Sequence, residues 1–414
     1  IVIINASYNE IKNNIANNNT GSEGDEEMPP SAGIIIADSN DNEILNNTAS
    51  ENYYGIILLN SNRNILKNNS AVNNTGIKTY EENELSSSGI VLYNSSNNIL
   101  HGNNASFNYH GIGLIYSDNN TISNNIASNN KNFDYSSGIV IGFSNNNAIS
   151  NNSIYNNDRF GISVLGTNNT TIYSNEIFNI GDNGIVIAGG ELDDSDEILI
   201  ENNTIYNCYW RSILVYNNSG NVSIIGNKLY NNSHYGIGIE HSSSVKVEYN
   251  EIYGNEEDGI NLLNSSSCII KSNTIYNNSD DGLCFDKSSD SIAINNDIIN
   301  NGDNGILLWN SSNNFVSDNL VSKSNSTGIW LGNSNNNTLT NNIANSNDVG
   351  IVLDSSNNST LINNTITNNE YGIYLSAEDN TTITGNTIYN NLWDFFTEND
   401  PGDCLLYTSD AADE

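Results

Sequence analysis

The sequence predicts an all-β protein, a right-handed, single-stranded parallel β-helix (solenoid) of about sixteen coils of about 22–23 residues each. Three observations predict this fold. The dipeptide Gly-Ile or Gly-Leu recurs with spacings that are mostly 22 or 23 residues. An asparagine follows most of these glycines by fourteen residues, and a small or branched apolar residue follows each asparagine by two. Columns that keep their phase over so many repeats indicate stacked, near-identical turns.

Each repeat contains short strands. At residues 350–353 and 360–362 apolar positions alternate with a period of two, and such runs are only three to five residues long. This pattern is typical of strands and too short for helices. Clusters of Asn, Ser and Asp, which favour turns, separate the runs. Three short strands per repeat predict a triangular coil that buries its apolar side chains only when it is stacked on its neighbours.

The asparagine column predicts a ladder of buried side-chain amides. Like side chains in register at the strand spacing can form hydrogen bonds up and down the stack. The apolar column beside it is mostly Ala at both ends and Ile in the middle, which predicts a core that is thinner near Asn69. The structural ladder includes Asn250, Asn273, Asn296, Asn319 and Asn342.

One domain is expected over residues 1–396, an internal fragment truncated at its N-terminus. Residues 397–403 are expected to end the last coil. Residues 404–414 share nothing with the composition before them and resemble the translation of a transposase-type sequencing adapter. We therefore expect this tail to be non-native and unpacked.

The charge balance argues against a nucleic-acid-binding protein. The chain has 12 Lys+Arg against 48 Asp+Glu, a formal net charge of −36 at pH 7, whereas phosphate neutralisation needs a basic surface. No run of about twenty apolar residues occurs, so no membrane span is expected in this segment. Outside the tail only Cys208, Cys268 and Cys284 remain, too few for a disulfide framework.

The repeat signature Gly-Ile-x-Leu-x-x-Ser-x-Asn-Asn-x-Ile-x-x-Asn-x-Ile is nearly complete at residues 305–321 and 350–366. It resembles the right-handed parallel β-helix repeats of NosD-like proteins, within the wider group of carbohydrate-binding and sugar-hydrolysis (CASH) domains. The resemblance covers about residues 1–396. Similar Asn-rich, acidic arrays are common in archaeal surface proteins, which implies an archaeal or bacterial protein with an extracellular, cell-surface or periplasmic location.

The NosD resemblance also implies an association with copper, which the residues argue against. Cu(I) prefers clustered Met, Cys or His side chains. The chain has Met28 as its one methionine, and its cysteines and histidines are scattered. The histidines are His101, His110, His234 and His241.

A polysaccharide-degrading hydrolase or lyase is the alternative function. The paired acids at 280–281 and 193–194 lack basic and histidine neighbours, and basic residues are almost absent from strand positions. Glu240 and Asp286 fall in one outward column two coils apart, about 10 Å. This separation is at or beyond the limit for an inverting carboxylate pair, about 6.5 to 9.5 Å. We therefore expect no catalytic residues.

Acids also recur just before the glycines, and a column of carboxylates could share Ca²⁺, with Asn and backbone oxygens completing its shell. The competing interpretation is an acidic, strongly solvated surface suited to saline surroundings. Apart from this calcium hypothesis, no cofactor is expected. The acids are Asp182, Asp258, Asp281, Asp303, Asp348 and Glu370.

Exposed aromatic side chains form the candidate binding site. Residues two and four positions after each glycine are expected to point outward, which exposes Leu307, Trp309, Trp330 and Tyr374, with Asp286 one coil below Trp309. Exposed rings on a flat sheet can stack against sugar rings. A second aromatic column is expected mainly to stabilise its sheet by stacking. It consists of Tyr155, Phe178, Tyr206, Tyr230, Tyr253 and Tyr276.

Together these observations predict a non-catalytic extracellular or cell-surface β-helix that serves as a spacer, adhesin or envelope component. Weak binding of a polysaccharide or glycan is expected at the tryptophans. Other surface proteins are the remaining class of partner considered.

Overall fold

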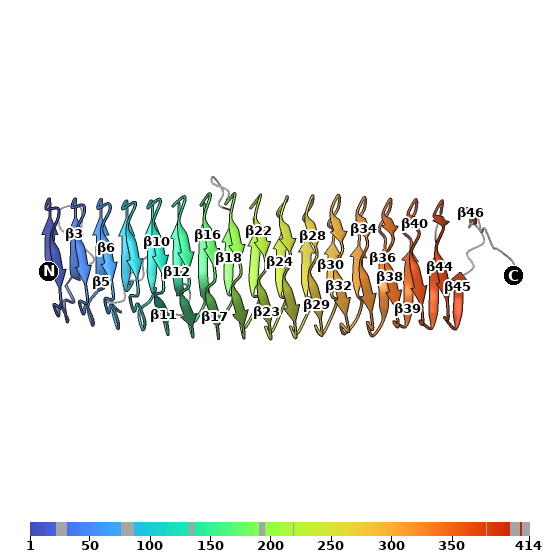
Figure 1. Cartoon of the computed structure of the whole chain (residues 1–414), viewed down its shortest axis with the longest axis horizontal. Helices are drawn as coiled ribbons and strands as arrows, with labels where there is room; N and C mark the ends of the chain where they lie inside the picture. Colours follow the sequence, from blue (N-terminus) through green and yellow to red (C-terminus); the bar gives the residue numbers. More distant parts are fainter. Residues whose placement is uncertain are drawn as a thin grey trace. The chain divides into compact units, whose positions relative to one another are not determined.

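A computed structural model of the chain describes residues 1–21, 31–75, 87–131, 136–189, 195–217, 219–377, 379–397 and 406–407. The chain divides into two compact units, Ile1–Ile213 (unit 1) and Leu214–Glu414 (unit 2). Three parallel sheets form a right-handed β-solenoid of about 15 turns, and the described residues contain no helix. This confirms the predicted fold class. Within each unit the strands of each sheet follow one another turn by turn (Figure 1).

In unit 1 each strand pairs in parallel with the strand one turn further along, as Ile139 does with Ile162. Sheet A contains β1 (Val2–Ile4), β3 (Ala32–Ala37), β5 (Tyr54–Leu59), β7 (Ile90–Tyr93), β9 (Ile112–Ile115), β12 (Ser137–Gly142), β15 (Phe160–Leu165) and β18 (Ile185–Ala188). Sheet B contains β2 (Glu10–Lys12), β4 (Glu43–Leu45), β6 (Ile65–Lys67), β8 (Ile99–His101), β10 (Thr121–Ser123), β13 (Ala148–Ser150), β16 (Thr171–Tyr173) and β19 (Leu199–Glu201). Sheet C contains β11 (Ile126–Ser128), β14 (Ser153–Tyr155), β17 (Glu176–Phe178) and β20 (Thr204–Tyr206). Strand β21 (Ile213–Tyr216) contains the boundary between the units.

Unit 2 repeats the same three-sided turn. Sheet A contains β24 (Ile237–Glu240), β27 (Ile260–Leu263), β30 (Leu283–Asp286), β33 (Ile306–Trp309), β36 (Thr327–Gly332), β39 (Val349–Asp354), β42 (Tyr371–Ser376) and β45 (Trp393–Thr397). Sheet B contains β22 (Ser223–Ile225), β25 (Lys246–Glu248), β28 (Ile269–Lys271), β31 (Ile292–Ile294), β34 (Phe315–Ser317), β37 (Thr338–Thr340), β40 (Thr360–Ile362), β43 (Thr382–Thr384) and β46 (Leu406–Tyr407). Sheet C contains β23 (Lys228–Tyr230), β26 (Glu251–Tyr253), β29 (Thr274–Tyr276), β32 (Asp297–Ile299), β35 (Leu320–Ser322), β38 (Ile343–Asn345), β41 (Thr365–Thr367) and β44 (Thr387–Tyr389).

The expected domain boundaries stay predictions. In the tail, Leu406 and Tyr407 pair in parallel with Thr382 and Ile383 of β43. The rest of residues 404–414, like residues 398–403 of the expected last coil, lies outside the described residues.

The narrow interior explains the glycine column. An added Cβ at Gly282 would lie 2.4 Å from Cγ2 of Ile298 and 2.7 Å from Nδ2 of Asn301. Only glycine lets the backbone approach the opposite side so closely. In the early turns of unit 1, where the apolar column is alanine, the third side of the coil is reduced to isolated bridges such as Thr48 to Ser70. The thinner core expected near Asn69 stays a prediction.

The asparagine ladder is present as predicted. Each Nδ2 donates to Oδ1 of the asparagine one turn further along: Asn250 to Asn273 at 3.0 Å, Asn273 to Asn296 at 3.0 Å, Asn296 to Asn319 at 2.9 Å and Asn319 to Asn342 at 2.9 Å. The same Nδ2 also donates to a carbonyl of the preceding turn, as Asn273 does to Val247 at 2.9 Å. Because each Oδ1 also accepts from a backbone N–H, the buried amides are fully hydrogen-bonded.

A second ladder runs five residues after the first and was not predicted. Asn255 donates to Asn278 at 2.8 Å, and Asn278 donates to Asn301 at 3.0 Å. These side chains are also buried. Two parallel amide ladders therefore hold successive turns of unit 2 in one register.

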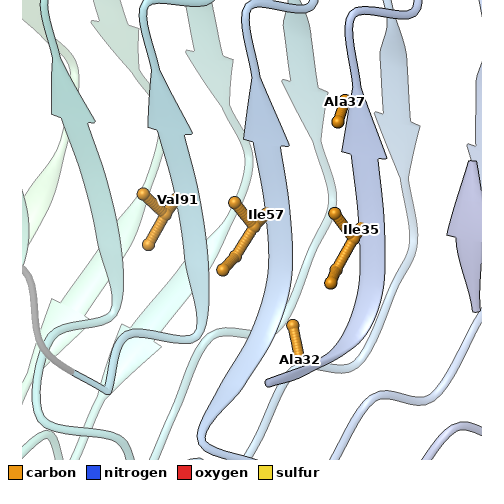
Figure 2. Packing of buried hydrophobic residues seen from close by; sticks show 5 residues of the cluster. All are labelled: Ala32, Ile35, Ala37, Ile57 and Val91. Atoms are coloured by element: carbon orange, nitrogen blue, oxygen red, sulfur yellow. The ribbon is translucent and has the colours of Figure 1, made fainter. Parts of the chain in front are cut away.

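In unit 1 the start of sheet A is apolar on both faces. Ile34 and Ile36 point inward, and the alternation of the strand turns Ile35 to the other face. There Ile35, Ile57 and Val91 form one row across β3, β5 and β7 and are buried together with Ala32 and Ala37 (Figure 2). The outer face of sheet A is therefore apolar, and not polar, at β3, β5 and β7.

Candidate functional site

The predicted tryptophan platform lies on the outer face of sheet A in unit 2. The register pairs Asp286 with Trp309 and Leu307 with Trp330, as the sequence predicted. Their neighbours Ile306, Leu308 and Ile329 are fully buried, which fixes the inward face of the sheet. By alternation the side chains of the platform point outward.

The two tryptophan rings contact each other edge to face. Their centroids lie 6.2 Å apart and the planes meet at 75°. Trp309 is 38% exposed and Trp330 is half-buried. In this arrangement the edge of one ring faces the plane of the other, and part of the aromatic surface stays open. Open aromatic surface of this kind can stack against sugar rings.

Gly332 makes room for the Trp309 ring. The register places Gly332 one turn beyond Trp309. A Cβ at Gly332 would lie 2.5 Å from Cε3 and 2.6 Å from Cζ3 of Trp309. The ring therefore lies directly on the glycine backbone, and any side chain at this position would displace it.

Two polar atoms of the platform have no hydrogen-bond partner among the described residues. They are Oδ1 of Asp286 and Nε1 of Trp330, and both are buried. Leaving such atoms unbonded costs about 1 to 3 kcal/mol each. A ligand hydroxyl that reached them would regain that cost.

Leu307 and Tyr374 lie in the same outer column but at different distances from the pair. Leu307 is directly beside Trp330, whereas Val352 separates Trp330 from Tyr374. Tyr374 stacks on Phe396 with ring centroids 5.2 Å apart. The structure thus brings Asp286, Leu307, Trp309 and Trp330 together and leaves Tyr374 two turns away.

The tyrosine column on sheet C has a different geometry. In unit 2 the rings of Tyr230 and Tyr253 lie 5.1 Å apart at 2°, and those of Tyr253 and Tyr276 lie 4.8 Å apart at 9°. In unit 1 Tyr155, Phe178 and Tyr206 stack in the same way. Each ring face is covered by the next ring, so these columns present mainly edges to solvent.

Three acids of unit 2 converge at the turns that precede β27 and β30. Asp258, Asp280 and Asp281 each place a carboxylate oxygen within 4.8 Å of the others. No other set of three acidic, histidine or cysteine side chains converges in this way within the described residues. Asp258 and Asp281 of the predicted acidic column are in this cluster and Asp280 is an addition to it, while the calcium hypothesis stays a prediction.

Two of these acids are buried and share one line of hydrogen bonds. Oδ1 of Asp258 accepts from the backbone N–H of Asp281 at 3.0 Å, and Oδ1 of Asp281 accepts from both nitrogens of Asn304 at 2.9 Å. Nδ2 of Asn261 donates to Asp258 at 2.8 Å. Burial raises the pKa of Asp258 to about 7 and that of Asp281 to about 8. In their ionised form these carboxylates cannot donate a hydrogen bond, so above these pKa values the Asp258–Asp281 step lacks the donor hydrogen that links an Asn–Asn step.

The residues considered for sugar hydrolysis and for copper binding do not converge within the described part of the chain. Leu263 lies between Glu240 and Asp286 in the register, which keeps the two acids two turns apart. Cys208, Cys268 and Cys284 are buried, and none is part of a described group of three metal-ligating side chains. Burial lowers the pKa of His110 to about 4. Residues 193–194 and Met28 lie outside the described residues.

Within the described residues, nothing forms a helix long and apolar enough to cross a bilayer. No curated protein is significantly similar to the chain in sequence.

Solved structures with low sequence identity are similar to the chain. The periplasmic alginate epimerase AlgG is 14% identical, with a TM-score of 0.47, over 82% of this chain and 77% of its own. The A-module of the mannuronan C-5 epimerase AlgE6 from Azotobacter vinelandii is 15% identical, with a TM-score of 0.42, over 93% of this chain and 89% of its own. The receptor-binding tailspike of bacteriophage Det7 is 10% identical, with a TM-score of 0.47, over 99% of this chain and 75% of its own.

A family model described as the right handed beta helix region matches residues 1–142, 88–250 and 235–391. These matches cover most of the sequence and coincide with the turns whose strands and ladders are described above. The chain therefore belongs to the right-handed β-helix family.

Proposed function

We propose that the protein is a non-catalytic β-helix that binds a glycan on the outer face of sheet A in unit 2. The observation that carries the proposal is the edge-to-face pair of Trp309 and Trp330 next to unbonded atoms of Asp286 and Trp330. Aromatic surface and a carboxylate acceptor within one strand spacing match the alternating apolar faces and hydroxyls of a sugar.

The contrast with the tyrosine columns supports the choice of site. The faces of the stacked tyrosine rings cover one another, whereas the tryptophan pair leaves ring surface open. Such a site needs no general acid or base, because it binds its ligand without catalysing a reaction. Leu307 extends the apolar surface beside Trp330, and Tyr374 offers a further contact to a longer chain.

The proposal includes an extracellular, cell-surface or periplasmic setting and a role as spacer, adhesin or envelope component. The strongly acidic composition and the NosD-like repeat signature support it. Copper is not part of it, because the described cysteines and histidines do not converge. Calcium stays a prediction, and Asp258, Asp280 and Asp281 are the residues that would hold it, since carboxylate oxygens are the ligands this ion prefers.

The test is the double substitution Trp309→Ala and Trp330→Ala. We expect loss of binding on a glycan array by at least about tenfold, since each ring contributes roughly 1 kcal/mol or more. The far-ultraviolet circular dichroism should persist, because both side chains lie outside the core. The matched control is Tyr230→Ala with Tyr276→Ala on sheet C, which should retain binding. Unchanged affinity in the tryptophan variant, or no binding by the parent to any glycan, would refute the proposal.

A further inference from the structure

In unit 2 the tyrosine column of sheet C brings phenol rings of successive turns into contact. The register of β23, β26 and β29 places Tyr230 opposite Tyr253 and Tyr253 opposite Tyr276. Their rings stack with centroids 5.1 and 4.8 Å apart and planes within 9° of parallel. This separation is close to the spacing of paired strands, about 4.8 Å, so each ring lies almost directly over the next. The carbons beside the hydroxyl groups (Cε), which join when two phenols are oxidised, therefore face each other.

A carboxylate beside the stack is placed to take the proton that oxidation of a phenol releases. The hydroxyl of Tyr276 donates to Oε1 of Glu251 at 2.8 Å. Glu251 is held by Nζ of Lys228 at 3.1 Å, and this ammonium group lies 5.4 Å from the ring centre of Tyr253. Burial and the hydrogen bond to Glu251 raise the pKa of Tyr276 to about 12. The phenol thus keeps its proton at neutral pH and needs a base when it loses an electron.

Unit 1 contains the same kind of column with one interruption. Tyr155, Phe178 and Tyr206 stack with centroids 4.9 and 5.1 Å apart. The hydroxyl of Tyr206 donates to Glu176 at 3.3 Å, as that of Tyr276 does to Glu251. The middle ring is phenylalanine, which has no hydroxyl and forms no phenoxyl radical. The two tyrosines of this column are two turns apart, which makes unit 1 an internal comparison for the stack of unit 2.

We propose that Tyr253 and Tyr276 form a site of oxidative cross-linking, at which a peroxide acting through a haem peroxidase joins the two rings as dityrosine. Each phenol loses one electron and one proton, and Glu251 accepts the proton of Tyr276. The two phenoxyl rings couple through a new Cε–Cε bond. The hydrogen on each joined carbon leaves as a proton, and each oxygen regains one. The O–O bond of the peroxide breaks, and the two electrons and two protons removed from the tyrosines convert it to two molecules of water.

The experiment treats the full chain, at low concentration, with a haem peroxidase and hydrogen peroxide. Dityrosine is followed by its fluorescence, and the joined peptides are identified by mass spectrometry after digestion with trypsin. Cleavage after Lys271 puts Tyr253 and Tyr276 on the separate peptides 247–271 and 272–287. We expect these two peptides as the main joined pair, and fragmentation of the pair assigns the linked positions.

Four variants test the parts of the site. Tyr253→Phe should abolish the joined pair. Glu251→Gln should slow its formation at least about fivefold, because an amide accepts the hydrogen bond but is a far weaker base. Glu176→Gln is the matched control and should leave the yield unchanged, since it removes the corresponding carboxylate of unit 1, where the column has no adjacent tyrosines. Phe178→Tyr completes that column and should add a second cross-link, between position 178 and Tyr206.

Several results would overturn the proposal. They are no link between Tyr253 and Tyr276 in the parent, as much dityrosine in Tyr253→Phe as in the parent, or links that form only between molecules and appear as dimers on denaturing gel electrophoresis. Equal rates in the parent and Glu251→Gln, or no added link in Phe178→Tyr, would also contradict it, because the carboxylate and the stacking would then not control the reaction. Thermal unfolding followed by circular dichroism checks that each variant is folded.

Discussion

At the scale of single residues, the buried asparagine amides set the register of the fold. Asn273 accepts from Asn250 and donates both to Asn296 and to the carbonyl of Val247. No apolar residue of similar size can make these bonds, and serine is too short to span them. The asparagine column is therefore a structural requirement of each turn rather than a consequence of composition.

Asn273→Ala should lower the free energy of unfolding by about 2 to 5 kcal/mol, because it leaves several buried groups without a hydrogen bond. Chemical denaturation followed by circular dichroism measures the change. The control is the adjacent, exposed Thr274→Ala, for which a loss under about 1 kcal/mol is expected. Equal losses in the two variants would show that the ladder contributes little.

Residue positions also explain what the sequence could not predict. Asp258 and Asp281 directly precede their glycines, whereas Asp303 and Asp348 stand one position earlier, and at a turn this single step decides whether a side chain is buried. The second ladder was missed because asparagine is so frequent that an additional column does not stand out.

At the scale of secondary-structure elements, the turns before β27 and β30 carry a pH-dependent element. The raised pKa values of Asp258 and Asp281 mean that the folded state binds protons more tightly than the unfolded chain, in which such groups titrate near about 3.9. Their contribution to stability is thus complete below about pH 4 and is lost as the pH rises through about 7 and about 8.

We expect Asp258→Asn with Asp281→Asn to remove this dependence and to stabilise the protein above pH 8, on the order of a few kcal/mol. The reason is that an amide restores the missing donor and carries no charge to bury. Thermal unfolding between pH 4 and pH 9 measures the effect. Asp297→Asn, an exposed position on β32, serves as the control and should follow the parent. Parallel curves for parent and double variant would contradict the assignment.

The strands and their order were predicted well from the sequence, because period-two runs and in-phase glycines are strong signals over many repeats. The orientation of the tryptophans was predicted for the same reason, since strand alternation fixes it. Strand alternation does not determine the angle between the two rings. The 75° angle between Trp309 and Trp330 depends on the room left by Gly332, a contact across turns.

At the scale of the whole molecule, the net charge of −36 governs how the chain responds to salt. Acidic side chains are distributed over both units, and their mutual repulsion opposes the folded state. Salt shortens the reach of that repulsion, from about 30 Å at 0.01 M to about 3 Å at 1 M. The acidic surface thus suits a saline medium.

The melting temperature is therefore expected to rise with NaCl between about 0.01 M and 1 M, by several degrees if the relief is about 1 to 2 kcal/mol. Differential scanning calorimetry measures it. Sucrose at matched osmolality separates screening from solute exclusion, because sucrose carries no charge. A melting temperature that stays constant or falls with salt would show that repulsion is unimportant in this chain.

The fully matched amide ladder also bears on how such a gene changes over time. Every turn offers its neighbours the same donors and acceptors, as Asn227 to Asn250 and Asn250 to Asn273 do at a separation of 23 residues. Replication slippage that adds or removes one complete repeat brings equivalent partners together, so the new protein is hydrogen-bonded from the first generation. Slippage that adds or removes part of a repeat leaves buried donors and acceptors without equivalent partners. Lineages that carry this gene should consequently differ in the number of whole repeats more readily than in the sequence of any one buried asparagine.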